Sequence, residues 1–367
     1  MDSSPEQSSP EQPPVERMAR LRRPQQWLAL GAFSLLFAGA LELAALPAAL
    51  LIGPMMAAIL AGTNGATVRV PRPLFGSAQA VVGCLVANSI SVDIFPVFYA
   101  EWALFFGTVV ATLTASSLLG WLISRWGILP GTTAVWGSSP GAATAMVLMA
   151  GAFGADQRLV AFMQYLRVIF VSMTAALVAK MWVDTSGVEV PPVVWFPPID
   201  PLAFGATIAI TIVGGLLGKL LRLPSPFFLG TFIFGAVVHL GFGVPMQLPP
   251  WLLAASYAMV GWSIGLNFTR PILRHAARAL PQIIASIVAL IAFCGGMAFV
   301  ISRVLGIDPL TAYLATSPGG MDSVAIIAAA AQNVDISFVM ALQSARFLVV
   351  LLIGPSVARL VARNVKD

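Results

Sequence analysis

Two short motifs interrupt otherwise apolar stretches of the sequence, and each combines a serine, a proline and a glycine. They occupy residues 139–141 and 317–319. Proline is favoured at the first position of a helix and serine at its N-cap, so each motif predicts that a new helix begins inside an apolar segment. The free backbone N–H groups at such a helix N-terminus suit an anion. Each motif is therefore a candidate anion site, and an ordinary structural kink is the alternative.

A glutamine and an arginine follow each motif within the next apolar segment. The pairs are Gln164 with Arg167 and Gln343 with Arg346. Residues three apart share one face of a helix, so the two members of each pair are expected to point the same way. An arginine near the centre of a bilayer costs about 2.5 to 3.5 kcal/mol, so it should face a partner or a wet cavity. Two interpretations stay open: the arginines brace backbone carbonyls at the broken helices, or they coordinate an anion.

One carboxylate, Asp322, breaks the symmetry between the two motifs. It lies about one helical turn after the second motif, at the position where the first half has Thr144. A carboxylate there could form an ion pair with Arg167 or Arg346, or it could bind the H⁺ or Na⁺ that drives transport. Asp322 is therefore the candidate ion-coupling residue, with the ion pair as the alternative.

The predicted substrate site combines both motifs, their hydroxyl neighbours and the two Gln-x-x-Arg pairs. Its residues are Ser138, Ser139, Pro140, Gly141, Thr144, Gln164, Arg167, Thr316, Ser317, Pro318, Gly319, Gly320, Asp322, Ser323, Gln343 and Arg346. No metal site is expected, because the two histidines, His239 and His275, lie far apart in the sequence. We also expect no catalytic residues and no cofactor, apart from H⁺ or Na⁺ as a coupling ion.

The composition indicates which solvent surrounds these residues. The chain has 367 residues, of which 58% are hydrophobic and 10% charged, and its mean hydropathy is +0.90. Too few polar residues remain to cover a soluble fold, which excludes a soluble cytosolic enzyme and predicts an all-α polytopic membrane protein. The net charge of +5 comes from basic residues scattered between apolar segments, a pattern typical of topogenic loop charges. The lipid bilayer is thus the expected partner, and direct nucleic-acid binding is not expected. A homodimer is a further candidate, because small residues favour close helix packing.

The two halves of the chain are related by an internal duplication. The pair Val82-Gly83 recurs as Val260-Gly261, and the Ser-Pro-Gly motifs recur at the same offset of 178 residues. Each repeat is expected to hold about five membrane helices plus a re-entrant or broken helix at its motif. The expected organisation is a disordered tail at 1–26, a membrane repeat at 27–183, a linker at 184–201, a second membrane repeat at 202–362 and a tail at 363–367.

Loop charges indicate that the two repeats are inverted relative to each other. Arg69 and Arg72 follow the second apolar segment of the first repeat, whereas the equivalent loop after Leu240 has no Lys or Arg. With five crossings per repeat, most of the 20 basic residues lie on the cytoplasmic side, as the positive-inside rule requires. Inverted repeats with both termini in the cytoplasm are therefore expected.

From residue 27 to 362 the sequence resembles the AbrB-type family of duplicated bacterial membrane proteins. The resemblance is carried by segments 136–141 and 316–320, each followed by its Gln-x-x-Arg pair. Members of this family are often labelled ammonia monooxygenase or AbrB family transcriptional regulator. The resemblance implies a multi-pass protein of the bacterial inner membrane with a transport function, sometimes linked to regulation of gene expression.

Neither family label agrees with the residues themselves. An ammonia monooxygenase subunit needs a metal site, and a DNA-binding regulator needs a soluble recognition element, so any effect on gene expression is expected to be indirect. The leading prediction is a secondary transporter that binds a small anionic or carboxylated solute between the broken helices. The alternative is a membrane sensor that binds a ligand without moving it. No enzymatic activity is expected.

Overall fold

The computed structural model describes most of the chain as helices. It describes residues 17–44, 48–90, 101–127, 129, 132–141, 143–182, 194–223, 225–319, 324 and 334–363. Within these ranges there is one 3-10 helix, Arg17–Arg20, and every other element is an α-helix. The expected all-α fold is confirmed over this part of the chain. Much of the expected tails and of the linker lies outside it.

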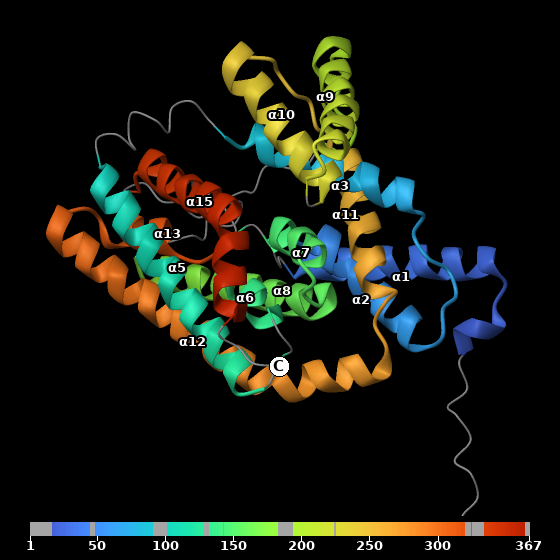
Figure 1. The fold of residues 1–367 in the computed structure, drawn as a ribbon, viewed down its shortest axis with the longest axis horizontal. Helices are drawn as coiled ribbons and strands as arrows, with labels where there is room; N and C mark the ends of the chain where they lie inside the picture. Colours follow the sequence, from blue (N-terminus) through green and yellow to red (C-terminus); the bar gives the residue numbers. More distant parts are fainter. Residues whose placement is uncertain are drawn as a thin grey trace, which may run out of the picture.

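Six helices form what we call the first bundle, which lies towards the right and the top of Figure 1. They are α1 (Arg23–Leu43), α2 (Ala49–Thr63), α3 (Arg72–Asn88), α9 (Pro201–Leu220), α10 (Pro226–Phe242) and α11 (Pro250–Gly265). Helix α2 packs against both α1 and α11, and α10 packs against both α9 and α3. Three of these helices come from each half of the chain, so both halves build the bundle together.

The other described α-helices form the second bundle. They are α5 (Trp102–Arg125), α6 (Thr133–Ser138), α7 (Ala143–Ala152), α8 (Gln157–Trp182), α12 (Arg270–Leu305), α13 (Pro309–Thr316) and α15 (Ile336–Arg363). Helix α6 packs against α5 and α8 in the same way that α13 packs against α12 and α15. The long helices also pair across the halves, α5 with α15 and α8 with α12. Helix α7, near the centre of Figure 1, shares one apolar core with α2, α3, α10 and α11 and so joins the two bundles.

Two glycines at equivalent positions of the halves allow equivalent helix contacts. A Cβ added at Gly83 of α3 would lie 2.6 Å from the carbonyl oxygen of Phe228 in α10. A Cβ added at Gly261 of α11 would lie 2.8 Å from the carbonyl oxygen of Leu51 in α2. Both distances are too short for real atoms, so each helix pair approaches closely only because the side chain is missing.

Six of the described helices are long and apolar enough to cross a membrane. They are α1, α5, α9 and α12, together with Gln157–Ala175 of α8 and Ile336–Gly354 of α15. The sequence predicts about ten spans. The difference arises mainly in α2, α3, α10 and α11, which have only 15 to 17 residues each, whereas a span needs about 20.

Candidate functional site

The first Ser-Pro-Gly motif ends the short helix α6. Ser139 is the C-cap residue of α6, with φ −57° and ψ 128°, and its Oγ donates to the carbonyl of Val135 at 2.8 Å. The next helix, α7, begins only at Ala143. The expectation that Ser139 caps the start of the following helix is therefore wrong. Its hydroxyl instead satisfies a carbonyl one turn back, at the end of the preceding helix.

The second motif ends α13 with nearly the same backbone geometry. Its C-cap residue, Ser317, has φ −52° and ψ 131°, and its N–H donates to the carbonyl of Tyr313 at 2.8 Å. It too closes the preceding helix, contrary to the expected N-cap. The hydroxyl that bonds back into this helix belongs to Thr316, whose Oγ1 donates to the carbonyl of Ala312 at 2.9 Å. The Oγ of Ser317 has no hydrogen-bond partner, whereas at the first motif the hydroxyl without a partner is that of Ser138. The two motifs therefore differ in which hydroxyl is free.

Gln164 and Arg167 of α8 hold the end of α6, and they share a helix face as their spacing predicts. The Nε2 of Gln164 donates to the carbonyls of Trp136 and Ser139 at 2.8 and 3.0 Å. The Nη1 of Arg167 donates to the carbonyls of Ser138 and Ser139 at 3.2 and 2.7 Å. Its Nη2 donates to Oε1 of Gln164 at 2.7 Å. A helix C-terminus has unpaired carbonyls and partial negative charge, so it is a favourable place for a guanidinium.

Gln343 and Arg346 of α15 hold the end of α13 with matching contacts. The Nε2 of Gln343 donates to the carbonyls of Leu314 and Ser317 at 2.7 and 3.0 Å. The Nη1 of Arg346 donates to the carbonyls of Thr316 and Ser317 at 3.2 and 2.7 Å, and its Nη2 donates to Oε1 of Gln343. We call these two arrangements the first and second clamp. The interpretation of the arginines as braces of backbone carbonyls thus has direct geometric support.

The charges of the two clamps are buried and not neutralised by any carboxylate among the described residues. The ion pair found among the described residues joins Asp156 and Arg158, and neither of them is a clamp residue. Arg167 is 2% exposed and Arg346 is 6% exposed. The Nε of each arginine has no hydrogen-bond partner. Two positive charges and two free N–H donors are a favourable arrangement for an anion.

The other predicted site residues lie around the clamps or outside the described ranges. The Oγ1 of Thr144 is 3.2 Å from the Oη of Tyr165. Gly319 packs against α8, where an added Cβ would lie 3.1 Å from Val171, so the second motif contacts a helix of the first repeat. The predicted residues outside the described ranges are Gly320, Asp322 and Ser323. The coupling role of Asp322 therefore stays a prediction.

Two aspartates fix the starts of the helices that carry the clamp residues. A carboxylate oxygen of Asp156 accepts from the backbone N–H of Arg158 at 3.0 Å. Likewise, a carboxylate oxygen of Asp335 accepts from the backbone N–H of Phe338 at 3.0 Å. Burial raises the pKa of Asp156, but the hydrogen bonds and the charge of Arg158 lower it by more, so this pKa lies below its ordinary value. Asp156 therefore stays ionised as a helix cap.

Several residues that the sequence does not single out also lie beside the first clamp. Ile283, Ile287 and Leu290 of α12 line one cavity together with Arg167. They are ordinary apolar residues of a membrane helix. Only the pairing of α8 with α12 across the two halves brings them to the clamp, and residue spacing within one segment carries no signal for such a contact.

Fold and site together define the class of protein. It is a helical, membrane-type protein in which two similar clamps hold the ends of two short, buried helices. Among the described residues, no group of three or more His, Cys, Asp or Glu side chains could hold a metal ion. A family model described as "Transition state regulatory protein AbrB" matches residues 14–362, and the chain belongs to this AbrB family.

Two relatives agree with this assignment, which confirms the resemblance stated from the motifs. "Putative regulator AbrB" of Escherichia coli (strain K12) is 46% identical over 338 residues, which cover 92% of this chain and 97% of the relative. "Uncharacterized protein YhjN" of Bacillus subtilis (strain 168) is 25% identical over 304 residues, which cover 77% of each chain. Neither name states a substrate.

Proposed function

We propose that the protein is a secondary transporter of a small anionic or carboxylated solute. The observation that carries the proposal is the pair of buried arginines, Arg167 and Arg346, whose charges no described carboxylate neutralises. A buried positive charge without a counter-charge is costly, and a bound anion removes much of that cost. The Nη1 and Nη2 atoms of both arginines already bond to the protein. The solute is therefore recognised by the free Nε–H groups and by the net charge.

The proposed architecture is two inverted repeats of about five membrane helices, each broken at its Ser-Pro-Gly motif. The contacts between the halves support it, because α6 packs against α15 and α13 packs against α8. A solute between the two clamps therefore touches both repeats. The first bundle serves as a scaffold, and the second bundle, which carries both clamps, moves against it to give alternating access.

The proposal also covers coupling, location and partners. Asp322 binds the coupling H⁺ or Na⁺, since it is the one carboxylate within a turn of the two motifs. The protein acts without enzymatic chemistry and without a metal or other cofactor. It lies in the bacterial inner membrane with both termini in the cytoplasm. Its partners are the solute, the lipid bilayer and a second copy of the chain, with no direct contact to nucleic acid.

Flux through the reconstituted protein tests this function. Liposomes that contain the purified protein and an unlabelled carboxylate (acetate, propionate, succinate or citrate in turn) are expected to accumulate the same labelled carboxylate by counterflow. The variant Arg346→Gln, reconstituted in equal amount, is expected to accumulate about ten-fold less, because one of the two recognising charges is gone.

Arg303→Gln is the matched control for this assay. Arg303 lies near the end of α12, with its guanidinium 5.2 Å from the ring centre of Phe299, and its loss is expected to leave counterflow unchanged. A carboxylate that binds without any counterflow would contradict the transporter and favour the second candidate function, a membrane sensor. The word "regulator" in the name of the Escherichia coli relative is the observation that favours that candidate.

A further inference from the structure

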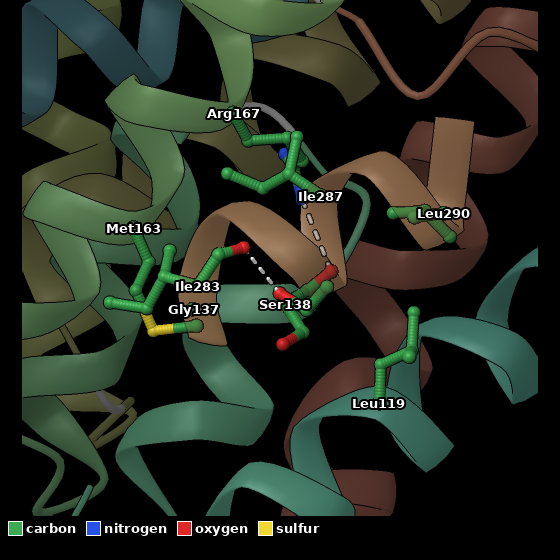
Figure 2. A pocket seen from close by; sticks show the side chains of 9 residues that line it. Leu119, Gly137, Ser138, Met163, Arg167, Ile283, Ile287 and Leu290 are labelled. Carbon is green, nitrogen blue, oxygen red and sulfur yellow. Dashed lines mark hydrogen bonds between the residues drawn. The ribbon is translucent and has the colours of Figure 1, made fainter. Parts of the chain in front are cut away.

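A small cavity lies beside the first clamp, between α5, the end of α6, α8 and α12. Figure 2 shows its walls, with Arg167 and Met163 from α8, Leu119 from α5 and three apolar side chains from α12. The cavity is lined by Leu119, Gly137, Ser138, Met163, Arg167, Ile283, Ser286, Ile287 and Leu290. It is therefore an apolar chamber with a few polar groups, built from both halves of the chain.

Two residues of the cavity wall each have a hydrogen-bond donor that is free. The Oγ of Ser138 and the Nε of Arg167 are buried and have no hydrogen-bond partner, and their side chains are 8% and 2% exposed. The third polar side chain in the wall, Ser286, already donates to the carbonyl of Ile283 at 2.7 Å. A buried polar group without a partner costs free energy, so both groups are favourable positions for a ligand oxygen.

We propose that this cavity binds the carboxylate of a short-chain monocarboxylate such as acetate or propionate. The two free donors match the two oxygens of one carboxylate, and the charge of Arg167 attracts it. The walls of Leu119, Ile287 and Leu290 suit an alkyl group. A phosphate, a sulfate or a dicarboxylate carries more acceptor oxygens than this wall has free donors to satisfy. The inference rests on the proposed function and names the substrate class for it.

The equivalent hydroxyl of the second clamp cannot play this role. Thr316 stands at the position of Ser138, but its Oγ1 donates to the carbonyl of Ala312 at 2.9 Å. The free hydroxyl at the second clamp belongs to Ser317, which does not line this cavity, so the monocarboxylate binds on the side of the first clamp.

The size of the cavity means that a ligand must enter with a movement of the wall. The space open to the centre of a water molecule is about 10 Å³, which is room for about one water molecule. A carboxylate with an alkyl group is larger, so α5 or α12 moves away from α6 as it binds. These three helices all belong to the second bundle, so this opening is separate from the movement of the second bundle against the first.

Calorimetric titration of the purified full chain with propionate tests the inference. Propionate is expected to bind the wild type, and Ser138→Ala is expected to weaken that binding about 10- to 100-fold, as for the loss of a hydrogen bond to a charged group. The unfolding temperature of the ligand-free variant is expected to stay the same or rise, because the hydroxyl has no partner in the protein. A purely structural role for Ser138 predicts the reverse pattern.

Ser117→Ala is the matched control, since Ser117 of α5 also has a buried hydroxyl without a partner but does not line the cavity. It is expected to bind propionate like the wild type.

Propionate that fails to bind the wild type, or binds Ser138→Ala equally well, overturns the inference. Flux of a dicarboxylate that is lost in Arg346→Gln but kept in Ser138→Ala also overturns the inference, while it agrees with the proposed transporter. Propionate binding that needs Ser138, without any flux, keeps the inference and contradicts the transporter.

Discussion

Replacing Gln343 with leucine is expected to lower the free energy of unfolding by about 2 to 4 kcal/mol. The amide Nε2 of Gln343 donates to the carbonyls of Leu314 and Ser317, and its Oε1 accepts from Arg346. Leucine has a similar size but neither donor nor acceptor, so the carbonyl of Leu314 and one guanidinium N–H lose this partner, and the carbonyl of Ser317 keeps only its bond from Arg346. No charge changes, so the loss reports the hydrogen bonds that Gln343 makes in the second clamp.

Thermal or denaturant unfolding of the purified protein checks this prediction. Gln164→Leu is expected to cost a similar amount, because the first clamp has the same contacts. Gln282→Leu, a change at an exposed position of α12, is the control and is expected to stay within about 0.5 kcal/mol of the wild type. If Gln343→Leu unfolds like this control, the clamps do not hold the ends of α6 and α13.

Single cysteines in two equivalent loops are expected to label from opposite sides of the membrane. Arg69 lies between α2 and α3, and Gly241 lies at the end of α10; both are exposed. Inverted repeats place equivalent loops on opposite faces, and the positive-inside rule puts Arg69 in the cytoplasm. An impermeant maleimide is therefore expected to label Gly241→Cys in intact cells and Arg69→Cys only after the membrane is opened.

The difference is all-or-none, which makes it the sharpest test of the proposed topology. The native Cys84 and Cys294 are fully buried, so the wild type is the control and is expected to give little labelling from either side. Labelling of both engineered cysteines from the same side rules out inverted repeats.

Much of the fold could be predicted from the sequence because it depends on composition and on spacing within one segment. The apolar stretches give the helices, and the i, i+3 spacing places Gln164 and Arg167 on one face of α8. The same arginine side chains agree with both interpretations made from the sequence, a brace for backbone carbonyls and a group that coordinates an anion. In each clamp the Nη1 of the arginine braces backbone carbonyls, and its Nε is left without a partner.

Other features depend on contacts that no single segment encodes. Whether a serine beside a proline caps the helix before it or the helix after it depends on which carbonyl its hydroxyl reaches, and Ser139 reaches Val135. The cavity beside Ser138 depends on α12, which is more than a hundred residues away along the chain. Spacing within a segment predicts neither.

The most direct test of the anion site is a thermal-shift screen of the wild type and the variants Arg167→Gln and Arg346→Gln against carboxylates, phosphates and amines. A ligand at 100 times its Kd adds about 2.7 kcal/mol to the stability of the folded state. We predict that a carboxylate raises the unfolding temperature of the wild type and of Arg303→Gln but not that of either clamp variant, and that amines have no effect. If no anion stabilises the wild type, or if both clamp variants respond as strongly as the wild type, the buried arginines do not form an anion site.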